Sequence, residues 1–208
     1  MREPITSCVP NRTPSQKEKA MPLTKLDPVA AFIVIDLQKG IVGLPTAHPT
    51  AEIVERSARL ARAFRERSLP VVLVNVTGRA PGRTSFNRPM PPFPPDWTEL
   101  VPELDPQPSD LLISKQRVGA FIGTSLDEGL RRRGVTQVFL AGVATSAGVE
   151  ATARSAYDHG YNVVLVVDAM TDMDPDAHRY SVEKTFPRLG EIDITENILK
   201  HLNESASQ

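Results

Sequence analysis

Short apolar runs alternate along this chain with amphipathic stretches, and this alternation limits the possible folds more than any other feature. The run Ala30–Ile35 (AAFIVI) is too short for a helix and rich in β-branched residues, as expected of a strand buried on both faces. Residues 51–67 instead place apolar side chains at helical spacing between charges. The same patterns predict further strands at 70–76, 110–114, 135–142, 161–169 and 190–195, and further helices at 125–133, 145–159, from 175 and from 195.

Buried strands that alternate with helices predict an α/β fold, a single-domain three-layer α/β/α sandwich with a mostly parallel, doubly wound sheet. A chain of 208 residues fits one such core. The helix ends carry their own signals. Gly134 is expected as a C-cap, Asp174 or Thr171 as the cap of the helix that begins near Pro175, and Thr195 as the cap of the last helix.

Two segments fall outside the alternation. Residues 1–27 show no periodicity and carry prolines and charges, which predicts a flexible N-terminal arm before a domain at 28–208; a strap across a partner subunit is the alternative. Residues 79–108 are rich in proline and contain the only tryptophan. A long loop of this kind is expected to be a lid, a binding loop or an oligomer contact.

The charge balance excludes several classes of partner. With 24 basic and 25 acidic residues the formal net charge is −1, so neither nucleic acid nor an anionic membrane surface is expected to bind. No apolar run is long enough to span a bilayer, and the first residues are too polar for a secretory signal. We therefore expect a cytoplasmic protein that binds a small neutral or anionic substrate.

Cysteine and histidine usage argues against a disulfide or a metal site. Cys8 is the only cysteine and lies in the predicted arm, so an intrachain disulfide is impossible and a catalytic role is disfavoured. The four histidines, His48, His159, His178 and His201, lack the spacing of metal ligands. No metal and no cofactor is predicted.

Three polar or small-residue features follow predicted strands. Asp36 follows the strand at 30–35, Lys115 follows the one at 110–114, and Gly142 begins a small-residue segment that opens a helix. The carboxyl ends of parallel strands meet at one edge of a sheet, where ligands bind, and the first turn of a helix directs N–H groups at a ligand. Taken alone, Asp36 is more typical of a helix cap or a loop anchor, and Lys115 is more typical of a solvated strand end.

In combination these features resemble the isochorismatase-like hydrolase superfamily over residues 28–202. The superfamily's cysteine-dependent members carry an Asp, a Lys and a Cys in this order, and here the position of the Cys is Gly148. The resemblance implies that Asp36 is a general acid/base and that Lys115 orients it and balances its charge. It also implies a cis Val143–Ala144 bond and backbone amides of Ala144 and Gly148 that hold an anionic oxygen.

The missing cysteine is compatible with activity. The superfamily's isochorismate pyruvate-hydrolases also lack it and cleave a vinyl ether by protonating the enol carbon. The resemblance therefore implies a cysteine-independent hydrolase of small carboxylated substrates. Two departures matter: Asn75, Val76 and Thr77 stand where true isochorismatases place a Gln, which predicts poor cleavage of isochorismate, and the Asp-x-His metal element of nicotinamidase-like members is absent.

Several side chains are candidates for substrate binding. Arg79, Arg83, Arg88 and Arg117 could hold a substrate carboxylate, because a guanidinium offers two parallel donors. Phe121 matches an aromatic residue of the family pocket, and a place in the hydrophobic core is the equal alternative.

Two other functions stay open beside the hydrolase. The chain could be a degenerate amidase that binds ligand without turnover, or a structural or regulatory subunit that pairs with an active homologue. The pair Asp36 and Lys115 argues against a pure binder, which has little use for an acid in the floor of its pocket. A homo-oligomer, dimer or tetramer, is expected.

Overall fold

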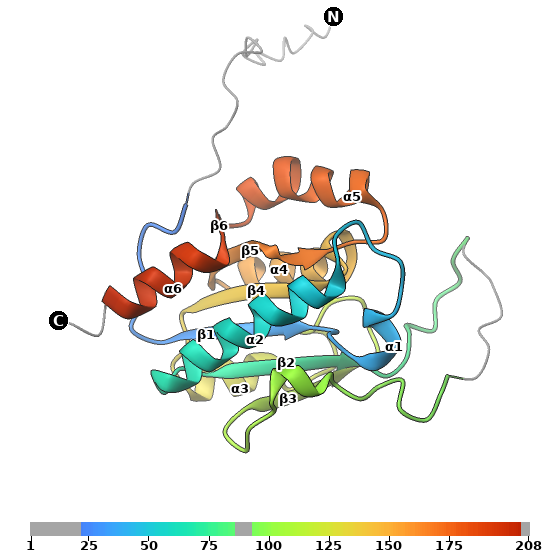
Figure 1. Cartoon of the computed structure of the whole chain (residues 1–208), viewed down its shortest axis with the longest axis horizontal. Coiled ribbons are helices and arrows are strands. Elements are labelled where there is room, and N and C mark those ends of the chain that lie inside the picture. The colour runs from blue at the N-terminus through green and yellow to red at the C-terminus, as the bar shows by residue number, and fades with distance from the viewer. Residues whose placement is uncertain (1–21, 86–92, 205–208) are drawn as a thin grey trace, which may run out of the picture.

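The computed structural model describes residues 22–85 and 93–204. Its centre is a sheet of six parallel strands in the order β3-β2-β1-β4-β5-β6 (Figure 1). The order reverses beside β1, which makes the sheet doubly wound and confirms the predicted fold class. The strands are β1 Ala30–Ile35, β2 Val71–Val76, β3 Leu111–Lys115, β4 Gln137–Val143, β5 Asn162–Thr171 and β6 Glu191–Asp193.

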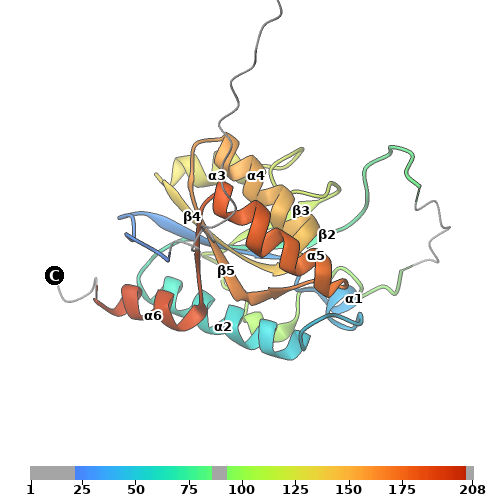
Figure 2. The same ribbon diagram turned by 90° about the horizontal axis from the view of Figure 1, so that it is seen from above.

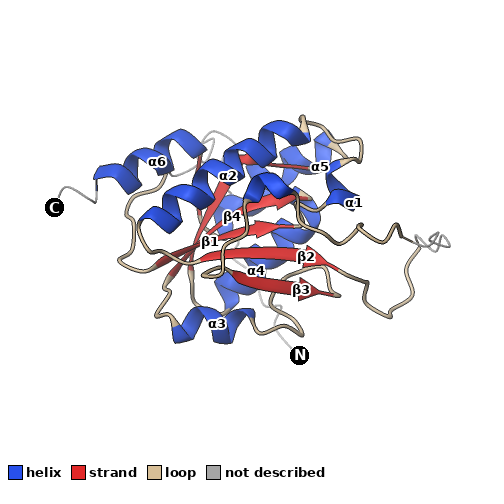
Figure 3. Cartoon of the chain, turned by 60° about the horizontal axis from the view of Figure 1, so that its bottom comes forward, coloured by secondary structure: helices blue, strands red, loops and turns tan. Residues whose placement is uncertain are grey.

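Helices cover both faces of the sheet (Figures 2 and 3). Phe32 and Val34 of β1 face one core with α2, and Ile33 and Ile35 face a second core with α3 and α4, because successive strand side chains point to opposite faces. All four side chains are fully buried, as the apolar run predicts. The helices are α1 Lys39–Val42, α2 Thr50–Glu66, α3 Leu126–Arg132, α4 Glu150–Asp158, α5 Pro175–Tyr180 and α6 Thr195–Glu204.

The region between β4 and α4 differs from the single helix predicted at 145–159. A π-helical turn, Thr145–Val149, precedes α4. Just before it, Gly142 has φ +117°, and a Cβ there would lie 2.0 Å from the Ile35 carbonyl oxygen. Only glycine permits this approach of β4 to β1. We call residues 142–149 the elbow.

The helix caps are resolved by the structure. The Asp174 side chain accepts from the Asp176 and Ala177 N–H groups at the start of α5, whereas Thr171 lies in β5. The cap expected from Thr195 is wrong in detail. Thr195 is the first residue of α6, and its N–H and hydroxyl both donate to the Asp168 carboxylate.

The segments outside the alternation are only partly described. Residues 22–27, within the predicted arm, pack on the domain: Leu23 is buried and its N–H donates to Asp193. Residues 1–21 lie outside the described part, as do residues 86–92 of the proline-rich loop. The rest of that loop contains one short helical turn, Pro102–Leu104. No helix in the described ranges has the length and apolar character that crossing a bilayer requires.

Candidate active site

The strand ends bring Asp36 and Lys115 together. The Lys115 Nζ lies 2.7 Å from the Asp36 Oδ2, and both side chains are buried, with 3% and 8% of their surface exposed. Nζ also donates to the Arg117 carbonyl oxygen at 3.3 Å. Asp36 has φ +53°, so the chain turns out of β1 at this residue. The pair forms an acid with one fixed cationic neighbour.

Burial decides the protonation behaviour of Asp36. Removal from water raises the pKa of Asp36 to about 6, and the attraction of the Lys115 ammonium only partly opposes this rise. The Asp36 Oδ1 is buried and has no hydrogen-bond partner within the described structure. Since a buried polar atom is normally paired, an Oδ1 without a partner marks Asp36 as a candidate functional group.

Gly148 of the elbow faces this carboxyl group. A Cβ at residue 148 would lie 3.5 Å from the Asp36 Oδ2, 2.9 Å from the Ile35 Cγ2 and 3.4 Å from the Val143 carbonyl oxygen. The Val143–Ala144 peptide bond is cis. Asp36, Lys115 and Gly148, which lie far apart in the sequence, therefore meet at one point.

A cavity of about 250 Å³ opens at this point. Its polar lining includes Asp36, Lys115 and the two arginines Arg79 and Arg117, and Ala144 also borders it. Most of the remaining wall is apolar and includes Ile41, Leu44, Val76, Val118 and Met173.

Two residues expected in the pocket lie elsewhere. Phe121 is buried in the core between the sheet and α3 and α4, with its ring stacked 5.1 Å from the His159 ring, and it does not line the cavity. Arg83 is exposed and does not line the cavity either. Arg88 lies outside the described residues. Of the four arginines, the structure places Arg79 and Arg117 at the cavity.

The end of β2 presents no amide to the cavity. The Asn75 amide donates to the Thr98 carbonyl oxygen at 2.8 Å and accepts from the Ser114 hydroxyl at 2.7 Å. Val76 contributes an apolar wall instead. This geometry agrees with the sequence departure from true isochorismatases.

Residues that the sequence analysis did not select hold the elbow from its outer side. The Asp172 Oδ2 accepts from the Ser146 N–H and hydroxyl, both at 2.7 Å. The His178 Nδ1 lies 2.8 Å from the Thr145 Oγ1. Burial, with the neighbouring His48, lowers the pKa of His178, while Asp172 opposes this. The sequence alone does not link Asp172 and His178 to the elbow, because the end of β5 and α5 meet the elbow only in the folded chain.

Gln38 is a further missed residue. It follows Asp36 by two positions, is fully buried, and bonds to Val76 and Trp97. Its position two residues after a strand-end acid is the sequence signal that could have marked Gln38 as a candidate site residue. Among residues 22–85 and 93–204, no cluster of three or more His, Cys, Asp or Glu side chains is arranged to hold a metal ion.

A parallel α/β domain with an acid, a lysine and a helix-opening elbow at the carboxyl edge of its sheet has the architecture of an α/β enzyme. Residues 30–196 match the family model described as the Isochorismatase domain. The chain therefore belongs to the isochorismatase family of hydrolases.

Individual relatives support this assignment. The isochorismatase family protein YwoC of Bacillus subtilis is 36% identical over 179 residues, which cover 83% of this chain and 93% of that protein. The structure of an isochorismatase family protein from Burkholderia thailandensis superposes with a TM-score of 0.83 at 38% identity, over 89% of this chain and 100% of the other. The ureidoacrylate amidohydrolase RutB of Agrobacterium fabrum is 40% identical over 91 residues, 42% of this chain and 40% of that protein.

Proposed function

We propose that this hydrolase acts without a cysteine nucleophile and cleaves a vinyl ether or related C–O bond of a small carboxylated substrate, with Asp36 as general acid/base. The observation that carries this proposal is the buried Asp36 carboxyl beside Gly148. Its pKa of about 6 leaves a useful protonated fraction near neutral pH, and its Oδ1 is free to hold the proton.

The reaction needs one acid and one water molecule. Protonated Asp36 gives its proton to the terminal carbon of the enol ether, and the double-bond electrons form the new C–H bond. The oxygen-stabilised cation then takes up water, and the resulting hemiketal expels the alcohol and leaves a ketone. The Asp36 carboxylate, held by Lys115, accepts the proton that the water loses, which restores the acid.

The remaining groups bind and orient the substrate. Arg79 and Arg117 lie where they can pair with a carboxylate, and backbone N–H groups of Ala144 and Gly148 are the proposed donors to an anionic oxygen. A cavity of about 250 Å³ favours a compact substrate. A cysteine side chain at residue 148 would project toward Asp36, but its Cβ would lie only 2.9 Å from the Ile35 Cγ2, so glycine fits this position.

A thiol mechanism has no support from the described chain. The described residues contain no cysteine, and Cys8 lies outside them. RutB is named as an amidohydrolase, so amide cleavage is the competing reaction that the test must distinguish from C–O cleavage.

The test uses 2-methoxypropenoate, the simplest carboxylated enol ether, whose hydrolysis yields pyruvate and methanol. We expect enzyme-dependent pyruvate formation that Cys8→Ser leaves unchanged and Asp36→Asn lowers by about 10²-fold or more. Isochorismate is expected to be cleaved with a kcat/KM below about 10⁴ M⁻¹s⁻¹, under the ordinary range for good substrates. Release of ammonia from small carboxamides or ureides, without any turnover of enol ethers, would overturn the proposal.

A further inference from the structure

The chain leaves the sheet at Asp36. The Asp36 N–H makes the last regular ladder bond, to the Val74 carbonyl oxygen at 2.9 Å. The Gln38 N–H then donates back to the Asp36 carbonyl oxygen at 2.9 Å, around the positive φ of Asp36. A non-glycine residue in this conformation is retained only where its surroundings hold it.

Beyond Asp36, the side chain of Gln38 rather than the backbone forms hydrogen bonds with β2. Its Oε1 accepts from the Val76 N–H at 2.8 Å, and its Nε2 donates to the Val76 carbonyl oxygen at 3.1 Å. One side-chain amide thus pairs with both polar groups of Val76, which lies just beyond the last regular ladder bond. Nε2 also donates to the Trp97 carbonyl oxygen at 3.0 Å.

The partners of Gln38 border the cavity or the loop beside it. Val76 forms part of the wall. The Trp97 ring lies against Gly40, where a Cβ would come within 2.0 Å of the indole Cδ1, and the Gly40 N–H donates to the Trp97 carbonyl oxygen. Gln38 itself is fully buried and does not line the cavity.

We infer that Gln38 is the positioning residue of the acid: its amide holds the turn at Asp36 and joins it to the cavity wall at Val76 and to the loop at Trp97. This inference rests on the proposed function of Asp36 and adds how its carboxyl is kept in place. The buried amide of Gln38 donates two hydrogen bonds and accepts one, and these three bonds tie its own turn to the end of β2 and to the loop at Trp97.

The test compares two buried glutamines at opposite ends of the sheet. Gln38→Leu removes the three bonds at nearly constant volume. Gln137→Leu is the matched control, because Gln137 is also buried and its amide also bonds only to backbone, to the Asp27 N–H and the Lys25 carbonyl oxygen. Both variants lose buried hydrogen bonds, but only the first is expected to disturb Asp36.

Three readouts are measured on the full chain. Turnover of 2-methoxypropenoate by Gln38→Leu is expected to fall about 10²-fold in kcat, the effect of a misplacement near 1 Å, with a smaller change in KM. The emission of Trp97, the only tryptophan, shifts to longer wavelength as its segment loosens. The Asp36 titration, followed by NMR of ¹³C-labelled aspartate and assigned with Asp36→Asn, moves toward the pKa of a solvated carboxyl.

The NMR and fluorescence readouts need no substrate, so they separate this inference from the proposed function. If no enol ether is cleaved, a moved Asp36 titration in Gln38→Leu still supports positioning. An Asp36 midpoint equal to that of Gln137→Leu overturns it, even if enol ethers are cleaved. Should Gln38→Leu fail to fold, Gln38→Asn keeps the amide but falls one methylene short of its partners, and the same comparison with Gln137→Asn applies.

Discussion

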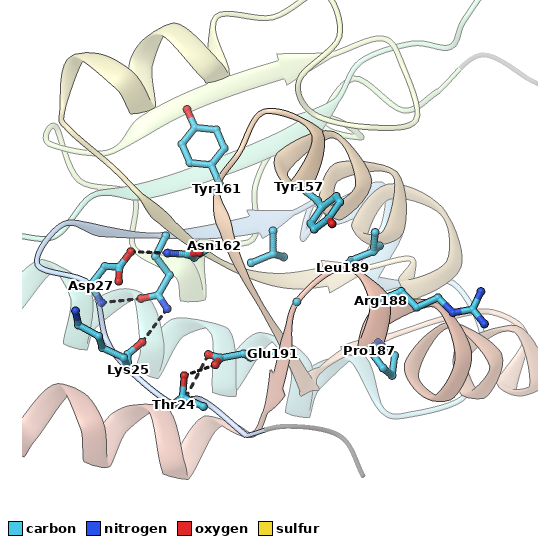
Figure 4. Close-up of a pocket in the computed structure, with 13 residues that line it drawn as sticks. Thr24, Lys25, Asp27, Tyr157, Tyr161, Asn162, Pro187, Arg188, Leu189 and Glu191 are labelled. Atoms are coloured by element: carbon cyan, nitrogen blue, oxygen red, sulfur yellow. Dashed lines mark hydrogen bonds between the residues drawn. The ribbon is translucent and has the colours of Figure 1, made fainter. Parts of the chain in front are cut away.

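The two ends of the sheet each carry a cavity and a polar cluster, and they differ in how their acids are paired. At the amino end, a groove of about 850 Å³ is lined by residues that include Asp27, Gln137 and Asn162 (Figure 4). There the Asp27 Oδ2 accepts from the Thr136 hydroxyl at 2.7 Å and the Asn162 amide at 2.9 Å. At the carboxyl end, the cavity has about 250 Å³, and the Asp36 Oδ1 has no partner within the described structure.

Under the proposed function, the chemistry takes place at the smaller of these two cavities. Two neutral donors bond to the Asp27 Oδ2, and the bonds of that cluster join the chain before β1 to β4 and β5, which is a structural role. Asp36 is buried against a single cation, with a pKa raised to about 6. An acid that is held out of water and left with a free oxygen costs stability, and that cost is typical of functional sites.

The largest contrast between the two ends is expected from removing each acid. Asp36→Asn keeps the shape of the side chain and an oxygen for Lys115 but cannot give a proton, so kcat should fall by about 10²-fold or more. Asp27→Asn should leave turnover unchanged and lower the unfolding free energy by about 1 kcal/mol, the value of one ordinary hydrogen bond. Pyruvate release and urea unfolding measure the two effects. Equal activity of both variants would remove Asp36 from the mechanism.

The pH dependence of kcat/KM also distinguishes Asp36 from Asp27. Asp36 must be protonated to act as an acid, so activity should be level below pH of about 6 and decline about tenfold per unit above it. Because the Lys115 charge lowers the pKa of Asp36, Lys115→Met should move the midpoint upward. Asp27→Asn should not move it. Activity that rises through pH 6 would mean that the carboxylate, as a base, starts the reaction.

The fold could be predicted because its signals are local. Runs such as Ala30–Ile35 report burial on both faces through their composition alone, and their alternation with helices fixes the layers. The π turn Thr145–Val149 and the extension of β5 to Thr171 depend on contacts across the sheet, so the periodicity of the sequence did not predict them. Lengths and exact ends of elements were accordingly less accurate than their type.

The contacts at the carboxyl edge of the sheet could be predicted where side chains follow strands, and they were missed where the partners come from distant segments of the chain. Asp36, Lys115 and Gly148 meet because the ends of parallel strands share one edge. Phe121, for which the pocket and the core were equal alternatives, lies in the core, because an aromatic side chain after a strand can turn into the core as readily as into a pocket. Gln38 was missed because its hydrogen-bond partners, Val76 and Trp97, come close to it only in the folded chain.

The last prediction concerns glycines at the two ends, where stability rather than activity is expected to change. In Gly148→Ala the new Cβ would lie 2.9 Å from the Ile35 Cγ2, an overpacking that costs about 1–3 kcal/mol, of which alanine's higher helix propensity offsets up to about 1 kcal/mol. Gly190→Ala, at the amino-end groove, should cost more, since its Cβ would lie 2.1 Å from the Val163 carbonyl oxygen and backbone cannot yield as a side chain can. Gly43→Ala, with open space around its Cβ, is the control and should stay within about 0.5 kcal/mol of the parent. Urea unfolding ranks the three. If Gly148→Ala is as neutral as Gly43→Ala, Ile35 does not occupy the space beside Gly148, and a side chain could be accommodated next to Asp36 after all.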